Sequence, residues 1–393
     1  MVGVRPEIRQ LQSSLIRWRR HFHRFPELGF KEKQTSAFIQ SHLREWGIPY
    51  EVLLDTGVVA TISDGSGGKV LAIRADMDAL PIQELNMVEY RSQIDGLMHA
   101  CGHDGHTAIA LGTAYYLWQH RQELKGTVKV IFQPAEEGPG GAKPMITAGV
   151  LANPKVDGIL GLHIWNNLPL GTIGLKQGAL MAAVDIFHCT ITGKGGHGAI
   201  PQQTIDAVVV AAQVVSALQT IVSRNIDPLD SAVVTIGKLQ AGTAPNVIAQ
   251  EAHLSGTVRY FSPRVGDVIY QRIEQILQGI CASYGASYTL DYQKCYPPVV
   301  NHPAMTELVR SVVQETIDLE VVPNCATLAA EDMSFFLQEV PGCFFFLGSA
   351  NPAKGLHYPH HHPRFDFDET VLGTGVEIFV RCAERFLGYA PAN

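Results

Sequence analysis

The sequence predicts an α/β fold in which a smaller module is inserted into a larger domain with a central, mostly parallel sheet. Three observations support this prediction. Helical and strand patterns alternate over the first part of the chain. Elements in the order βαββαβ follow, and the alternation of helices and strands returns after Pro297 and Pro298. The 393 residues suffice for two or three folding units. We therefore expect one main domain from residues 1–182 and 297–393, and an inserted domain from residues 183–296.

The composition excludes several classes of protein. A hydrophobic content of 46% is typical of a folded globular chain, and a net charge of −7 without basic blocks argues against nucleic acid or an anionic membrane as the main partner. Residues 207–222 come nearest to a membrane span, but polar residues interrupt them, so a buried or interface helix is expected. No secretory signal is visible and the seven cysteines lie far apart, which indicates a reducing, cytoplasmic setting.

Helices should cover the sheet of the main domain. Pro6 can open a helix that ends before Pro26, and an apolar pattern through Trp46 stops at Gly47, a typical helix end. Later helical patterns cover about 107–120, 306–317 and 371–386, and a further strand is expected over 343–347.

Three apolar runs of the main domain each lead into polar side chains that can bind metals. Because parallel strands place their carboxyl ends at one edge of a sheet, these side chains should face one crevice. The runs and the residues that follow them are 70–73 with Asp76, 127–132 with Glu136 and Glu137, and 158–162 with His163.

The inserted domain should contain four strands and two helices in the order βαββαβ, which is that of a ferredoxin-like domain. A compact module of this kind can be inserted whole. The expected strands are 184–191, 232–239, 251–261 and 287–292, and the expected helices are 205–222 and 265–284.

The 16 histidines are concentrated in two places. In the segment MHACGHDGH at 98–106, Cys101 and His103 can bind one divalent ion from a loop before a helix. The alternative is a polar helix start, which leaves the cysteine unexplained. Four more histidines fall within 357–362 and should supply at least one further imidazole, with the others near the site or on the surface.

Glu136 and Glu137 lie side by side before a glycine-rich turn. Neighbouring carboxylates repel each other unless a cation or a shared proton separates their roles. One can bind a metal while the other takes a proton from the metal-activated water. His163 would alone be more typical of a core histidine, but its position at a strand end favours a ligand role.

The segment GKGGHG at 193–198 matches the GxGxxG pattern of dinucleotide-binding sites. Such a site needs a helix directly after the glycines, whereas Pro201 follows closely, and a P-loop is excluded because Gly195 follows Lys194. A nicotinamide-dependent oxidoreductase is therefore disfavoured. What remains is a loop that presents His197, either without a role or to a reacting carbonyl.

Six sequence motifs occur in the order in which a known protein family has them, at 19–29, 74–81, 99–106, 132–138, 193–197 and 331–335. Together they resemble the amidohydrolase branch of the aminoacylase and carboxypeptidase G type metallopeptidases, which includes hippurate hydrolases, N-acyl-amino-acid amidohydrolases and auxin-conjugate hydrolases. The resemblance covers residues 19–386 approximately. It implies a homodimer or higher oligomer in which the inserted domain serves as lid and dimerisation domain.

The resemblance also implies a set of site residues. Two divalent ions, with Mn²⁺ or Zn²⁺ favoured over Ni²⁺ or Co²⁺, would be bound by Cys101, His103, Glu137, His163 and His361. The last of these follows from the segment HHPRFDFDE at 361–369, and His357 is its rival.

Further roles follow from the same resemblance. Glu136 would act as general base, and His197 would polarise the substrate carbonyl, from the same or a partner subunit. Asn246 and Arg259 would hold the substrate carboxylate. Asp76 would orient a ligand rather than bind the metal, because Arg74 stands where relatives outside this branch have a histidine.

The expected activity is hydrolysis of the amide bond of N-acyl L-amino acids, with acetyl, benzoyl or similar acyl groups. A dipeptidase or carboxypeptidase is a less favoured alternative. A catalytically silent binding protein on the same scaffold is the other alternative, because a fold does not fix a function. The presence of Glu136, Glu137, Cys101 and His103 argues against that silent protein.

Overall fold

The computed structural model describes residues 3–65 and 67–388. The chain divides into two compact units. The main unit comprises Met1–Gly178, Val300–Cys325 and Asp332–Asn393, and the inserted unit comprises Ala179–Val299 and Ala326–Glu331.

The segment Ala326–Glu331 was expected in the main domain and instead belongs to the inserted unit. Backbone hydrogen bonds explain the difference. The Thr327 N–H donates to the Leu180 carbonyl at 3.0 Å, and the Thr327 carbonyl accepts from the Ala182 N–H at 3.1 Å. Such pairing between distant segments leaves no mark in the local sequence pattern.

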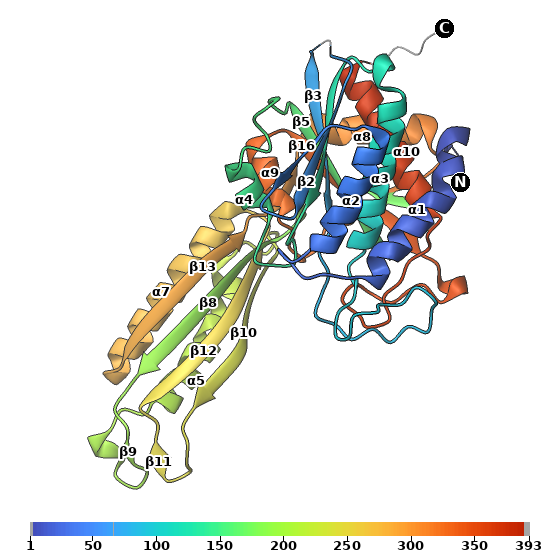
Figure 1. The fold of residues 1–393 in the computed structure, drawn as a ribbon. Helices are drawn as coiled ribbons and strands as arrows, with labels where there is room; N and C mark the ends of the chain where they lie inside the picture. Colours follow the sequence, from blue (N-terminus) through green and yellow to red (C-terminus); the bar gives the residue numbers. More distant parts are fainter. Residues whose placement is uncertain (1–2, 66, 389–393) are drawn as a thin grey trace. The chain divides into compact units, whose positions relative to one another are not determined.

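The main unit is built around an eight-stranded mixed sheet in the order β1-β2-β4-β3-β5-β16-β6-β15 (Figure 1). The central pairs β4–β3, β3–β5 and β5–β16 are parallel, which confirms the predicted fold class. Antiparallel pairs flank them at β2–β4 and β16–β6. The strands are β1 (Tyr50–Leu53), β2 (Gly57–Ser63), β3 (Lys69–Asp76), β4 (Gly126–Gln133), β5 (Gly158–Pro169), β6 (Thr172–Gly174), β15 (Glu320–Val322) and β16 (Gly342–Ala350).

Helices cover this sheet, and the expected helix limits match those observed closely. Helix α2 ends where Gly47 takes the left-handed conformation at φ 73°, which a residue without Cβ adopts freely. Helix α3 is buried on almost every side, and it packs against α1 and α10. The helices are α1 (Pro6–Arg24), α2 (Lys33–Trp46), α3 (His103–Gln119), α4 (Ala142–Thr147), α8 (Pro303–Thr316), α9 (Met333–Glu339) and α10 (Val371–Leu387).

The inserted unit has the predicted βαββαβ order and a core of its own. Its antiparallel sheet runs β10-β12-β8-β13. Along β8, Phe187 and Cys189 are buried while Ile186 and His188 are exposed, so one face of the sheet carries the core. The elements are β8 (Ala183–Thr192), α5 (Ala207–Leu218), α6 (Thr220–Asn225), β10 (Ala232–Ala241), β12 (Glu251–Tyr260), α7 (Pro263–Tyr284) and β13 (Ser287–Tyr296).

One helical stretch of the described residues, Ala207–Asn225, has the length and apolar composition of a membrane span. Val210 and Val214 on one side join the core of the inserted unit, whereas Val208 and Val209 are exposed. The core helix of a folded protein passes the same test of length and composition. The helix is thus buried on one side and exposed on the other.

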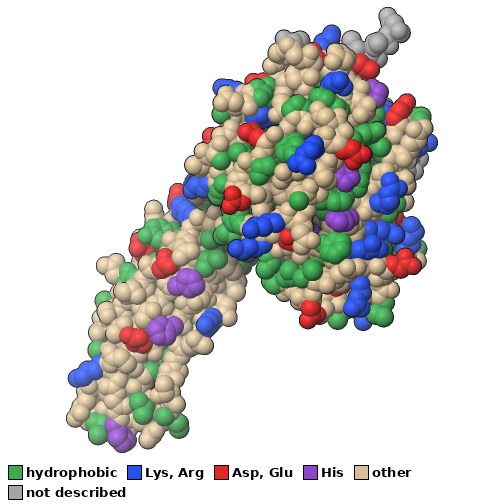
Figure 2. Space-filling model, in the orientation of Figure 1, with side chains coloured by type: hydrophobic (Ala, Val, Ile, Leu, Met, Phe, Trp, Pro, Cys, Tyr) green, Lys and Arg blue, Asp and Glu red, His purple; other side chains and the backbone are tan. Residues whose placement is uncertain are grey.

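Charged side chains of both signs and free thiols are spread over the described residues. Lys and Arg side chains are interspersed with acidic ones on the face of the molecule shown in Figure 2, and no continuous basic surface covers that face. All seven cysteines are free thiols, and four of them lie in the main unit.

Candidate metal centre

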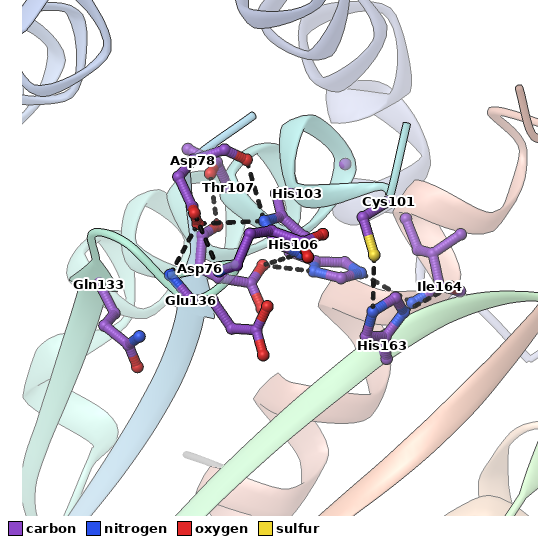
Figure 3. A network of polar contacts seen from close by, with 12 residues as sticks. Asp76, Asp78, Cys101, His103, His106, Thr107, Gln133, Glu136, His163 and Ile164 are labelled. Atoms are coloured by element: carbon purple, nitrogen blue, oxygen red, sulfur yellow. Dashed lines mark hydrogen bonds and ion pairs between the residues drawn. The ribbon is translucent and has the colours of Figure 1, made fainter. Parts of the chain in front are cut away.

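Three parallel strands bring their polar residues to one crevice of the main unit, as the sequence predicts. Asp76 ends β3, Glu136 follows β4, and His163 lies on β5. Cys101 and His103 reach the same place from the start of α3, and all five side chains are buried (Figure 3).

Five groups of described side chains could each hold a metal ion, two of them contain Glu136, and Cys101 belongs to two others. The first group with Cys101 is Cys101, His103 and His163, and the second is Cys101, Glu137 and His361. Within each group the ligand atoms lie within 4.8 Å of one another. The Cys101 Sγ is 3.5 Å from the His163 Nε2, and the His361 Nε2 is 3.1 Å from the Glu137 Oε1. The shared thiol makes a pair of neighbouring metal positions possible.

Backbone carbonyls orient two of these imidazoles. The His103 Nδ1–H donates to the Asp78 carbonyl at 2.9 Å, and the His163 Nδ1–H donates to the Ile164 carbonyl at 2.7 Å. Each ring therefore keeps its Nε2 lone pair for another partner. The His103 Nε2 is buried and makes no hydrogen bond with any described residue, which is the state expected of a metal ligand.

A third compact group, Asp76, His103 and His106, has the donor types but not the free atoms of a metal site. The His106 Nδ1 lies 2.6 Å from the Asp76 Oδ1, and its Nε2 accepts from the Ile164 N–H at 2.8 Å. Both nitrogens of His106 are therefore occupied. Arg74 also donates to Asp76 at 2.6 Å, so the structure places Asp76 between a histidine and an arginine.

The late histidine cluster separates into different environments. The His361 N–H donates to the Ala100 carbonyl at 2.8 Å, and His361 has a left-handed φ of 63°. This tie to the loop before Cys101 brings its side chain to Glu137. His360 is instead hydrogen-bonded to the Ile164 carbonyl at 2.8 Å, and His357 is exposed and belongs to none of the candidate groups.

Asp78 is a site residue that the sequence reasoning missed. Its Oδ1 accepts from the Glu136 N–H and its Oδ2 accepts from the Glu137 N–H, each at 3.0 Å. Since its carbonyl also holds His103, Asp78 links two of the segments that form the crevice. The alternation Arg74, Asp76, Asp78 at a strand end places both carboxylates on one face, and this period of two was the available signal.

The charges of the crevice are unbalanced without a cation. Burial raises the pKa of the Cys101 thiol well above its usual value, and the carboxylates of Glu137 and Glu136 raise it further. Burial also opposes ionisation of Glu137, but the hydrogen bond from His361 and the charge of His103 outweigh it and lower its pKa. A divalent ion would stabilise both the thiolate and the carboxylate. The donor set of thiol, imidazole and carboxylate therefore fits two transition-metal ions.

The predicted substrate-binding residues lie in the inserted unit, and the structure separates them. His197 ends the short strand β9 (Gly196–His197), which pairs with β11 (Val247–Ile248). The neighbouring Asn246 accepts a hydrogen bond from the Gly198 N–H at 2.8 Å, so His197 and Asn246 lie together on an exposed loop. Arg259 is near the far end of β12, about 25 Å along the strand from its first residue. Asn246 and Arg259 of one chain therefore lie at different ends of the inserted unit's sheet, and their joint role in holding the substrate carboxylate stays a prediction.

An α/β domain that gathers a thiol, three imidazoles and a carboxylate in two groups that share Cys101, with a further glutamate beside them, defines a metal-dependent hydrolase. The chain belongs to the peptidase family M20/M25/M40, whose model matches residues 72–385. It is a hydrolase that acts on amide bonds, as the sequence predicts.

The similarity to known proteins covers nearly the whole chain. It is 46% identical over 372 residues to a putative amidohydrolase, YhaA, of Bacillus subtilis, covering 94% of this chain and 93% of that protein. It is 41% identical over 378 residues to an N-acetyl-L-cysteine deacetylase of the same organism, covering 96% and 89%. The crystal structure of B. subtilis YXEP, described as a dinuclear metal-binding peptidase of the M20 family, matches with a TM-score of 0.86 and 38% identity, covering 97% and 100%.

Proposed function

We propose that the protein hydrolyses the amide bond of N-acyl L-amino acids and releases a carboxylic acid and a free amino acid. One observation carries the proposal: the buried Glu136 lies directly beside two candidate metal groups that share Cys101. The similarity to an N-acetyl-L-cysteine deacetylase supports this substrate class.

Glu136 is the residue assigned to proton transfer. Divalent ions, when bound, supply Lewis-acid activation of water and of the substrate carbonyl. Glu136 takes the proton that the attacking water loses and returns it to the departing amine. Its Oε1 lies 3.4 Å from the Asp332 N–H, and its own N–H is held by Asp78, so both ends of the residue are positioned before substrate arrives.

Two ions are proposed for each chain, one for each candidate group, with Mn²⁺ or Zn²⁺ favoured. His103 and His163 would bind one ion, Glu137 and His361 the other, and Cys101 would serve both. Thiolate and imidazole donors suit several first-row metals, so Co²⁺ and Ni²⁺ should also restore activity to some extent.

A substrate panel tests the proposal directly. Purified protein is stripped of metal with a chelator, reconstituted with one metal at a time, and assayed on N-acetyl, N-benzoyl and indole-acetyl amino acids. We expect hydrolysis that disappears on stripping and returns with about two metal equivalents per chain. Saturable binding of these compounds without turnover after reconstitution would identify a silent binding protein instead.

We further propose that His197 acts on a substrate held by a second copy of the chain. The exposed loop position of His197, its separation from Arg259 along the sheet, and the exposed valines 208 and 209 of α5 all support a dimer formed through the inserted unit. In a symmetric dimer each copy would then complete the site of the other.

Mixed dimers test this arrangement. Glu136→Gln and His197→Ala are each expected to be nearly inactive alone. After the two variants are unfolded and refolded together, half of the dimers carry one chain of each kind, and one site in such a dimer contains both native residues. The mixture should recover about one quarter of wild-type activity. No recovery in a mixture shown to contain mixed dimers would place His197 on its own chain's substrate.

A further inference from the structure

The turn after β4, which carries Glu136, is held by two buried carboxylates. Asp78 accepts from the N–H groups of Glu136 and Glu137, as described above. The preceding N–H, that of Ala135, donates to the Glu32 Oε1 at 2.9 Å. Three consecutive peptide N–H groups thus point at carboxylate oxygens, and Glu32 is the one member of this arrangement without an assigned role.

Ala135 needs this support because its backbone is left-handed, with φ at 58°. An L-residue rarely adopts this conformation, because its Cβ then lies too close to the carbonyl oxygen that follows it. The conformation of Ala135 sets the direction in which the next side chain, that of Glu136, leaves the backbone. A relaxed Ala135 would therefore aim Glu136 elsewhere.

Glu32 is itself rigidly placed. It is fully buried, and the Thr56 hydroxyl donates to its Oε2 at 3.0 Å. It immediately precedes α2, and its carbonyl accepts from the Ser36 N–H at 2.9 Å in the first turn of that helix. The carboxylate is thus fixed at both oxygens between α2 and the turn.

The chain before Glu32 also packs directly on the turn. A Cβ placed on Gly29 would lie 2.6 Å from the Gly138 carbonyl oxygen and 2.9 Å from the Ala135 Cβ. Both distances are shorter than real contacts allow, so the turn can lie where it does only because residue 29 is a glycine. Segment 29–32 therefore fixes the turn by close packing as well as by hydrogen bonding.

We infer that Glu32 is a positioning residue for the hydrolytic reaction, which holds Ala135 left-handed and thereby aims Glu136 at the reacting atoms. This inference rests on the proposed function, in which Glu136 is the proton acceptor. Glu32 touches neither substrate nor metal in this scheme, so its loss should lower kcat while KM and metal content stay unchanged.

Three variants test the inference. Glu32→Ala removes the acceptor, and we expect kcat to fall about 10- to 100-fold through misplacement of Glu136. Glu32→Gln should retain most of the activity, because its Oε1 can still accept from Ala135 while its amide donates to the Thr56 hydroxyl. Adding Ala135→Gly to Glu32→Ala should restore part of kcat, because glycine adopts a positive φ without a Cβ clash.

Metal content, KM and thermal midpoint are measured for every variant, and Glu339→Ala, at an exposed helix end, is the control. If Glu32→Ala does not fold, Gly29→Ala is used in its place. The added methyl group displaces the turn while Glu32 stays intact, so the kcat of Gly29→Ala should fall to the same extent. Unchanged kcat in a folded Glu32→Ala or Gly29→Ala protein, or a loss of activity that follows a loss of metal, would overturn the inference. Wild-type protein that hydrolyses nothing in the substrate panel would instead reject the proposed function.

Discussion

The crevice of the main unit and the His197 loop of the inserted unit present their functional groups in opposite ways. In the crevice, His103 and His163 are buried and each ring is fixed by a backbone carbonyl. On the loop, His197 is exposed, and its Nδ1 accepts only from the N–H of Ala199, two residues away, at 3.0 Å. The comparison indicates that the candidate metal ligands are preorganised within the main unit, whereas the side chain of the loop histidine is held by a single local hydrogen bond.

The rigidity of the crevice extends outward through buried charges. Arg19 is fully buried and donates to Asp104 and Asp366 at 2.7 Å each. Asp104 is the neighbour of His103 at the start of α3, and it is also 2.8 Å from the His23 Nδ1. Buried charges of this kind are retained only with close partners, so they fix α1 and α3 in one arrangement. The His197 loop has no comparable buried ion pairs among the described residues of the inserted unit.

The strongest test of the contrast is Glu136→Gln. Removal of the proton acceptor should lower kcat about 10²- to 10⁴-fold while both metal ions stay bound, since neither of the two groups that share Cys101 includes this carboxylate. Steady-state kinetics and metal analysis check the two parts of the expectation. Glu339→Gln is the matched control, and a Glu136→Gln enzyme with near wild-type kcat would show that another residue transfers the proton.

The corresponding change on the loop is His197→Ala. We expect kcat to fall about 10²-fold through loss of one stabilising contact to the carbonyl oxygen, with no change in metal content or thermal midpoint. The exposed His188 of β8 provides the control as His188→Ala. If His197→Ala lowered the thermal midpoint instead of kcat, the loop histidine would be structural and the contrast between the two regions would fail.

His106 tests how far preorganisation contributes to metal binding. It joins Asp76 to the Ile164 peptide, whose carbonyl orients His163. His106→Ala should therefore weaken metal binding about 10- to 100-fold, although His106 itself has no nitrogen left for a metal. Competition with a metal-sensitive dye measures the metal affinity. The control is His120→Ala, a partly exposed residue at the end of α3 opposite to His103, which should leave the affinity unchanged. Equal affinities in both variants would mean that His163 needs no such support.

Stability should also depend on pH through the buried His23. Burial and the Arg19 charge oppose protonation of His23, but hydrogen bonds to Asp104 and Glu84 outweigh them and raise its pKa to about 9. His23 therefore stabilises the fold fully below its ordinary value of 6.5, and this contribution is lost as pH rises through about 9. Between about pH 6 and pH 10, wild-type protein should lose on the order of 3 kcal/mol more unfolding free energy than His23→Gln. The unfolding free energy of both proteins is measured by urea denaturation at each pH. If it changed with pH equally in the two proteins, the raised pKa of His23 would be contradicted.

Much of the fold could be predicted from local sequence patterns. The strands that end at Asp76 and Gln133, and the βαββαβ module, were predicted because apolar periodicity and glycine ends are local features. The strand expected over 158–162 was also found, but it continues past His163 to Pro169. Strands β1 and β2 were missed, and so was the membership of Ala326–Glu331 in the inserted unit. Strand β2 and the segment Ala326–Glu331 depend on pairing with residues distant in the sequence, which a local pattern does not contain, whereas β1 is a short strand that pairs with the nearby β2.

The site divides along the same line. The sequence by itself determined which residue types could bind metal, because Cys101, His103, Glu136 and Glu137 stand at strand or helix ends and His163 follows an apolar run, each with the donor atoms that metals require. Only the tertiary structure decided that His361 rather than His357 reaches Glu137, and that Asp78 and Glu32 hold the turn that carries Glu136. The physical reason is that donor chemistry belongs to a residue, whereas hydrogen-bond geometry and burial belong to the packed chain.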